Sequence, residues 1–201
     1  MADMRAGGLG PMGWHLGLGL ALIAASLGLP WWSAERTART ESRAGQIVEL
    51  LLEAGLEIGR DAAPDPDVVF ARLLKLARAR DAFFGDLETA APVDDSWLVA
   101  TNKHYAFRLA PIAKDPETRS APDAVPGVAA LAWPLAASGP AHGMFYAPED
   151  GPRTYTRNLT INAFGFDDRR PAARAGHRRA ANAIDTRLAY RSVDDERWIL
   201  Y

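Results

Sequence analysis

The chain has 201 residues, a formal net charge of −2, 48 % hydrophobic residues and 24 % charged residues. This composition is typical of a folded domain and argues against global disorder, and a charge so close to zero gives no basic field for nucleic acid. The sequence contains no cysteine, which excludes disulfides, thiolate nucleophiles and cysteine-ligated metal sites.

The most apolar segment lies near the N-terminus, over residues 13–32, and contains no Asp, Glu, Lys or Arg. About 20 apolar residues are what an α-helix needs to cross a hydrocarbon core of roughly 30 Å. Trp31 and Trp32 suit the interfacial belt of a retained helix better than the cleavage site of a signal peptide, and a buried core helix is usually shorter. The sequence therefore predicts three parts: a short N-terminal segment (1–12), a transmembrane anchor (13–32) and a soluble domain (33–201).

The charges that flank the anchor leave its orientation open. Arg5 precedes the anchor, whereas Arg36, Arg39 and Arg43 follow it, so a count of positive charges places the C-terminal side inside the cell. A long domain after an anchor can be translocated regardless of such charges. The opposite orientation, with the soluble domain outside, is therefore also compatible with the sequence.

Small residues recur every four positions along the anchor, at Gly13, Gly17, Ala21 and Ala25. This spacing stacks them on one side of a helix, and such stripes let helices approach each other closely in lipid. We interpret these residues as a helix-packing stripe, although a chance pattern in a chain rich in Gly and Ala is the alternative.

Two helices are expected at the start of the soluble domain. A helical period of three and four residues over 33–60 is marked by Ala44, Ile47, Leu51, Ala54 and Ile58. This helix should continue from the anchor. After a break at 62–66, Asp65 or Asp67 is expected to cap a second helix that has Pro66 near its start and ends near Arg80.

From about Trp97 the pattern changes to short runs typical of strands. Strands are expected over 105–109, 128–135, 143–146 and 154–159, and Asp150-Gly151 is expected to join the last two as a hairpin. Residues 198–201 are a candidate closing strand, and residues 180–190 are a candidate helix. Helices followed by a small antiparallel sheet give an α+β fold.

No catalytic or metal-binding motif stands out in the rest of the sequence. The four histidines, His15, His104, His142 and His177, lie apart from one another without ligand spacing. Acidic pairs such as Asp94-Asp95 lie beside expected turns and lack the pattern of a calcium loop. We therefore expect no catalytic residue, no metal and no cofactor, and a protein that is not an enzyme.

Five arginines cluster near His177: Arg169, Arg170, Arg174, Arg178 and Arg179. Such a cluster is a candidate patch for an anionic partner, which would be nucleic acid, anionic lipid or an acidic protein. A solvated arginine-rich loop is the simpler interpretation, because aromatic residues that could stack on bases are not interleaved with these arginines. Nucleic acid is therefore not favoured as a partner.

Several segments together carry a resemblance to a known family. They are the apolar stretch 20–30 with a proline at its end, the polar stretch 34–39, the strand-like runs 104–108, 130–134 and 145–146, and the turn Asp150-Gly151. In this order they resemble type IV pilin-like proteins and the pseudopilins of type II secretion. The resemblance covers most of the chain and rests on no single specific motif. It implies a long N-terminal helix, embedded in the membrane at its start, that packs on an antiparallel sheet in an exported head.

The resemblance also places a candidate processing site at Gly8 and Leu9. Counting back from Pro30, Gly8 stands at the glycine after which the family's precursors are cleaved. Leu9 stands where the family has phenylalanine, and Gly13 stands where it has a glutamate. These two replacements imply a diverged or minor member.

Together, these features predict a single-pass structural protein of the inner (cell) membrane with a periplasmic or extracytoplasmic pilin-like domain. Its expected partners are the membrane, other pilin-like subunits and components of a secretion or pilus-type system. Two alternatives stay open at this point. One is a membrane-anchored periplasmic enzyme or sensor whose site is assembled from non-adjacent residues. The other is a cytoplasmic head on an inverted anchor.

Overall fold

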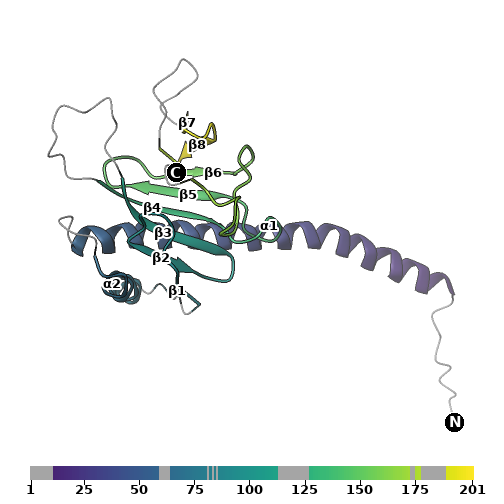
Figure 1. Cartoon of the computed structure of the whole chain (residues 1–201). Helices are drawn as coiled ribbons and strands as arrows, with labels where there is room; N and C mark the ends of the chain where they lie inside the picture. Colours follow the sequence, from purple (N-terminus) through teal and green to yellow (C-terminus); the bar gives the residue numbers. More distant parts are fainter. Residues whose placement is uncertain are drawn as a thin grey trace, which may run out of the picture.

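A computed structural model describes residues 11–58, 64–80, 82, 84, 86–112, 127–172, 175–177 and 189–201, with the backbone alone for 11–30. These residues form an α+β fold of two helices and an eight-stranded antiparallel sheet (Figure 1), as the sequence predicts for the fold class. The elements are α1 (Pro11–Ile58), α2 (Pro66–Ala79), β1 (Glu88–Ala90), β2 (Leu98–Thr101), β3 (Tyr105–Ile112), β4 (Gly127–Pro134), β5 (Met144–Pro148), β6 (Thr154–Thr156), β7 (Ala189–Arg191) and β8 (Arg197–Leu200).

The strands lie in the order β1-β2-β3-β4-β5-β6-β8-β7, and every neighbouring pair is antiparallel. The central pair is the longest, with β3 and β4 in register from Tyr105 opposite Pro134 to Ile112 opposite Gly127. The predicted hairpin across Asp150-Gly151 is confirmed, since Phe145 of β5 lies opposite Tyr155 of β6. The strands expected over 105–109, 128–135, 143–146 and 198–201 are confirmed, with small shifts at their ends.

Three expectations about the sheet are wrong in detail. The strand expected over 154–159 ends at Thr156, because Asn158 has a left-handed φ of 55° that breaks the extended backbone. Residues 189–191 form strand β7 and not the end of a helix, while 180–188 lie outside the described residues. Strand β1 precedes the expected start of the sheet, and its three residues are too few to show a period of two.

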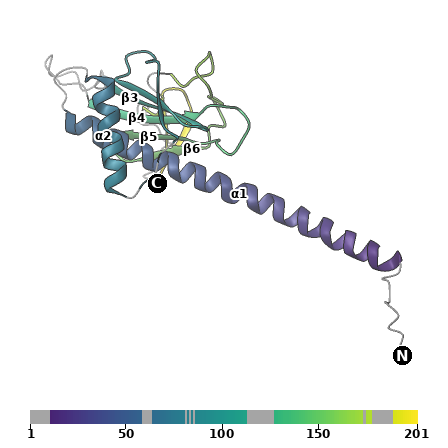
Figure 2. The ribbon, with the colours of Figure 1, turned by 90° about the horizontal axis from the view of Figure 1, so that it is seen from below.

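Helix α1 is one continuous helix of 48 residues, and its C-terminal part alone lies on the sheet (Figures 1 and 2). Its fully buried residues begin at Ala44 and include Ile47, Leu51 and Ala54, which is the predicted apolar stripe. They pack against β3, β4 and β5. The predicted continuity of the helix from 13–32 into the head is confirmed. Among the residues whose side chains the structure describes, no helix is long and apolar enough to cross a bilayer.

Helix α2 packs against α1 and β2 through Val69, Leu73 and Ala77. Its start is fixed as predicted: the Asp65 carboxylate accepts a hydrogen bond from the Asp67 N–H at 2.9 Å, and Pro66 occupies the first helical turn. The two helices cover the same face of the sheet (Figure 2).

The sheet has a hydrophobic core on each face. On the helical face, Phe107, Leu109 and Phe145 pack against α1. On the other face, Trp133 and Trp198 are buried with a second set of residues: Ala106, Ala129, Leu131, Met144, Tyr146, Ala163, Ala175 and Tyr190. The segment that follows β6 covers this second face, where the indole N–H of Trp133 donates to the carbonyl of Gly165 at 2.7 Å. Strand β4 is buried almost throughout because both of its faces are covered.

Candidate functional site

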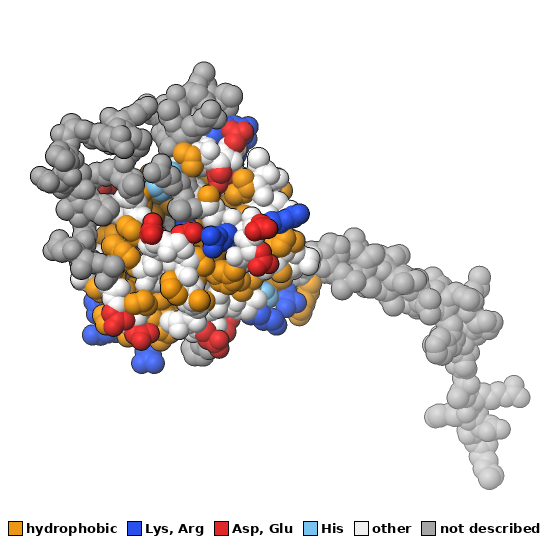
Figure 3. Space-filling view, in the orientation of Figure 1, with side chains coloured by type: hydrophobic (Ala, Val, Ile, Leu, Met, Phe, Trp, Pro, Cys, Tyr) orange, Lys and Arg blue, Asp and Glu red, His pale blue; other side chains and the backbone are white. Residues whose placement is uncertain are grey.

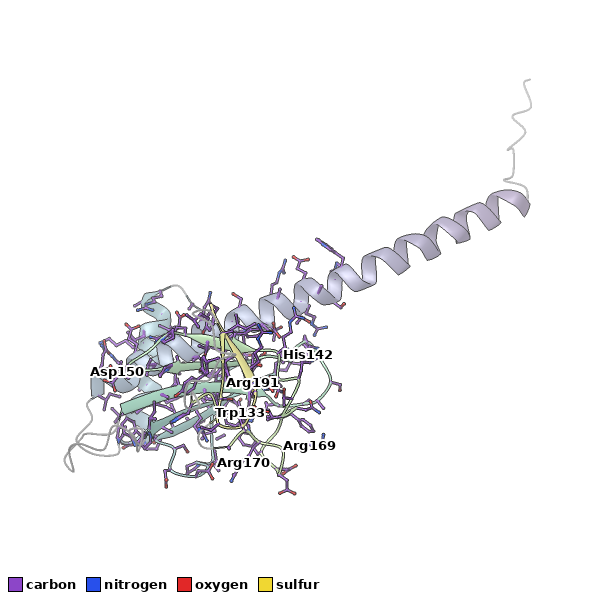
Figure 4. The ribbon with its side chains drawn as sticks, turned by 90° about the horizontal axis from the view of Figure 1, so that it is seen from above. Trp133, His142, Asp150, Arg169, Arg170 and Arg191 are labelled. Atoms are coloured by element: carbon purple, nitrogen blue, oxygen red, sulfur yellow. The ribbon has the colours of Figure 1, made fainter. Side chains whose placement is uncertain are left out.

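The described features that bear on function gather at one end of the head, which we call the base: the end from which α1 projects. Strand β5 starts there at Met144, and β6 ends there at Thr156, directly opposite. Strand β3 starts there at Tyr105, next to the β2–β3 turn at 102–104. Figure 4 shows His142 beside the emerging helix, with Asp150 at the opposite end of the sheet.

Glu41 ties α1 to the sheet at the base. One carboxylate oxygen accepts a hydrogen bond from the Gly143 N–H at 3.0 Å, and the other accepts one from the Tyr155 hydroxyl at 3.4 Å. A Cβ at position 143 would collide with the Tyr155 ring, so this close approach requires glycine. Burial, and then the nearby Glu41 carboxylate, raise the pKa of Tyr155 to about 12.

Arg43 makes a second tie between α1 and the rest of the head. Its guanidinium donates to the Asp86 carboxylate at 2.6 Å and lies 5.7 Å from the centroid of the Phe84 ring. A surface hollow along this flank of α1 is lined by Glu35, Ala38, Arg39, Ser42, Arg43, Gln46, Ala82 and Phe84. With the Glu41 contacts, this tie holds the helix at a fixed angle where it leaves the sheet.

Exposed aromatic and basic side chains lie on the helix, and beside it, where it leaves the base. Trp31 and Trp32 are 67 % and 70 % exposed, and Arg36 and Lys103 are exposed nearby. Burial lowers the pKa of His104, the charges of Lys103 and Arg36 lower it further, and the Asp86 carboxylate opposes this shift. Figure 3 shows basic side chains beside exposed hydrophobic ones where the helix leaves the head.

A buried carboxylate organises the chain that follows β6. Glu196 is 2 % exposed, and its oxygens accept hydrogen bonds from the Thr156 hydroxyl at 2.5 Å and from the N–H groups of Thr160 and Ile161 at 2.9 and 3.1 Å. Within the same segment, the Asn158 side chain donates to and accepts from the backbone of Ala163, both at 2.7 Å. Sequence reasoning missed Glu196 because its partners lie about 40 residues earlier, beyond any local pattern.

At the tip of this segment, Leu159 is 79 % exposed. The hydrogen bonds on either side of it fix the backbone that carries it. The exposed leucine is therefore carried by a loop whose backbone these hydrogen bonds hold in place.

The predicted anionic-partner patch is described only in part. Arg169 lies over the Phe164 ring at 5.3 Å, and Arg170 donates to the Asp94 carboxylate at 2.9 Å. Asp94 also lies 3.6 Å from the buried guanidinium of Arg108, which donates to the carbonyl of Ala172. Both described arginines of the patch thus contact the head itself. The other three lie outside the described residues: Arg174, Arg178 and Arg179.

The three histidines whose side chains are described lie in different segments of the folded chain. His104 lies in the β2–β3 turn, His142 lies in the β4–β5 loop, and His177 lies against the Tyr146 ring at 5.8 Å. Within the described ranges, no group of three or more His, Asp or Glu side chains is placed to hold a metal ion.

The two predictions for the N-terminal region concern residues that the structure describes in part or not at all. The candidate processing site, Gly8 and Leu9, lies outside the described residues. The candidate packing stripe lies within the α1 backbone, but the side chains of its members are outside the described part: Gly13, Gly17, Ala21 and Ala25. Comparison with family models, with curated proteins and with solved structures found no match to this chain.

Proposed function

We propose that this chain is a membrane-anchored, pilin-like structural protein with an exported head, acting as a minor component of a secretion or pilus-type system. The observation that carries the proposal is the division of α1 into two parts. Residues from Ala44 onward are buried on the sheet, whereas the preceding part of the same 48-residue helix projects away from the head (Figure 2).

The projecting part needs an apolar environment. It contains residues 13–32, a run without any charged side chain. A helix that is apolar on all sides is stable when lipid or other helices surround it, and isolated helices in water are marginal. A bilayer meets that need for a run of this length, and neighbouring subunits can meet it along the stripe of small residues.

The attachment of helix to head supports an assembly role. Glu41 and Arg43 fasten α1 to the sheet at the base, and the core continues the attachment beyond them. A head held in this way follows its helix as one unit when the helix packs among others. The proposal includes processing after Gly8 and a periplasmic or extracytoplasmic head.

Single cysteines test the proposal against a clean background, because the chain has none of its own. Ala21→Cys places a thiol on the predicted stripe, and Ile23→Cys places one two residues on, near the opposite side of the helix. We expect both variants to stay in membranes washed with alkaline carbonate, and oxidation to cross-link Ala21→Cys to another subunit but not Ile23→Cys. Release of the chain by carbonate would overturn the membrane anchor, and equal cross-linking of the two variants would overturn the packing stripe.

A second measurement decides the orientation. Alkaline phosphatase fused after Tyr201 folds to an active enzyme only outside the cytoplasm. We expect an active fusion, with mass spectrometry of the mature N-terminus showing Leu9 as its first residue. An inactive fusion made at normal levels indicates the inverted anchor.

A further inference from the structure

We propose that the base of the head is a docking surface for anionic lipid headgroups, so that the head rests on the membrane and does not stand clear of it. The inference rests on the membrane anchoring proposed above. The docking surface consists of Trp31, Trp32, Arg36, Lys103, Arg157 and Leu159.

Topology brings these residues to one end of the molecule. Lys103 lies in the turn immediately before β3, and Leu159 follows the end of β6. Both strand ends lie at the base, where the Gly143 N–H donates to Glu41 of α1. A membrane that is crossed by the projecting part of α1 therefore also faces Lys103 and Leu159.

The distances match a lipid headgroup layer. Trp32 precedes Glu41 by nine residues of α1, and at 1.5 Å per residue this is about 14 Å along the axis. Leu159 lies three residues beyond Thr156, which allows it to reach at most about 10 Å below the sheet. The headgroup layer above each side of the hydrocarbon core is roughly 5–8 Å thick. With the tryptophans at the edge of that core, the upper limit of this reach places Leu159 within the headgroup layer.

On the α1 side, the base carries basic side chains that can contact an anionic surface. Arg39 and Arg43 are paired with Glu35 and Asp86, whereas Arg36 and Lys103 are in no ion pair with a described residue. The Asn102 side chain accepts hydrogen bonds from the N–H groups of His104 and Tyr105, and these bonds fix the turn that carries Lys103.

Arg157 and Leu159 complete the surface on the side of β6. Arg157 is exposed and lies beside the Tyr155 hydroxyl, where the Glu41 carboxylate offsets part of its charge. Leu159 is held in place by Asn158 and Glu196 and can enter the headgroup layer with little further loss of backbone entropy.

One corner of the base has the opposite charge and is left outside the docking surface. The β7–β8 turn carries Asp194 and Asp195, which are engaged locally by Ser192 and Arg191. This turn adjoins Leu159, because its Glu196 accepts a hydrogen bond from the Thr160 N–H, so the attraction to an anionic surface is strongest on the α1 side, at Arg36 and Lys103.

The test uses the full chain with one reporter cysteine. Leu159→Cys carries a fluorophore at the base, and Asp150→Cys carries the same fluorophore at the opposite end of the sheet (Figure 4). Each protein is inserted into vesicles of phosphatidylcholine alone or mixed with phosphatidylglycerol. We expect lipid bearing a spin label in its headgroup to quench the fluorophore at 159 in the anionic vesicles, with protection from aqueous iodide. The fluorophore at 150 should show neither effect in either vesicle.

A charge variant identifies the lipid as the partner. Each basic side chain near an anionic surface is worth about a fivefold change in partition, so Arg36→Gln with Lys103→Gln should shift docking about 25-fold toward the undocked state. The matched control, Lys75→Gln with Arg78→Gln, removes the same charges from exposed positions on α2 and should leave docking unchanged. Circular dichroism of each variant confirms the fold.

The outcomes separate this inference from the proposed anchor. A chain that fails to float with either kind of vesicle overturns the anchor, and this inference with it. A chain that floats with both, while the fluorophore at 159 stays open to iodide in anionic vesicles, overturns the docking surface alone. Protection that grows with protein concentration and not with anionic lipid also overturns it, because the base is then covered by another protein chain.

Discussion

At the scale of single residues, the Glu196 side chain holds a segment that lies far from it in the sequence. It is a buried carboxylate without a basic partner among its described contacts, and the donors to it are two backbone N–H groups and one hydroxyl. The N–H groups of Thr160 and Ile161 are partly buried, and the Glu196 carboxylate is the acceptor for both. The carboxylate therefore determines the conformation of a segment that lies elsewhere in the sequence.

Replacing this carboxylate should be costly. Glu196→Ala leaves the buried Thr156 hydroxyl and the partly buried N–H groups of Thr160 and Ile161 without their acceptor, and we expect a loss of about 1–3 kcal/mol in the free energy of unfolding. Asp195→Asn is the control, since Asn also tolerates the positive φ at that position and the side chain is largely exposed. Urea unfolding in detergent gives the free energy of unfolding of both variants. Equal midpoints for the two would show that the hydrogen bonds of Glu196 contribute little.

At the scale of elements, α1 faces the sheet with two glycines that differ in the room available for a side chain. A Cβ at Gly45 would lie 3.4 Å from the Phe145 ring, which is an ordinary contact. A Cβ at Gly55 would lie 2.6 Å from a methyl group of Leu109, a side chain that is fully buried in β3. The helix thus approaches β3 closely at its C-terminal end.

This difference predicts opposite effects of the same substitution. Gly45→Ala should raise the free energy of unfolding by about 0.5–1 kcal/mol, because alanine restricts the unfolded chain and suits a helix. Gly55→Ala should lower it by about 1–3 kcal/mol, since Leu109 has to move within a packed core. Thermal unfolding of the two variants side by side gives the sign of each. A stabilising Gly55→Ala would mean that the helix can shift away from β3.

The elements also show which parts of the fold can be predicted from the sequence alone. The apolar period of α1, the Asp65 cap of α2 and the hairpin at Asp150-Gly151 are local patterns, and each is confirmed. The short edge strands β1 and β7 have three residues each, and pairing with their neighbours, more than their own pattern, makes them strands. The base could not be predicted as a site because it joins α1, two loops and a turn that are separated by more than a hundred residues.

At the scale of the whole molecule, buried tyrosines make folding sensitive to alkaline pH. Burial raises the pKa of Tyr105 and Tyr146 well above the usual value of 10, and burial together with Glu41 raises that of Tyr155 to about 12. The folded state therefore favours the protonated phenols. Their contribution to stability is fully present below pH 10, the pKa of an unfolded tyrosine, and is lost as the pH rises through the higher folded values.

We accordingly expect the urea midpoint to be unaffected by tyrosine ionisation below pH 10 and to fall between pH 10 and 12. Tyrosinate absorbance in the near ultraviolet should appear together with unfolding and not before it. Tyr155→Phe should reduce the slope of this fall, because it removes one of the titrating groups. Tyrosinate absorbance that reaches its full value in a chain still folded would contradict the assignment.

The order of the strands also has a consequence for how the protein is made. Strand β8 lies between β6 and β7, so β7 gains its partner only when residues 197–200 are available. Trp198 of the second core and the adjacent Glu196 enter at the same late stage. While the chain is being synthesised, α1 is complete long before the sheet that it covers. A growing chain must therefore keep the apolar face of that helix, and the unpaired edge of β6, from other partners until its last strand arrives.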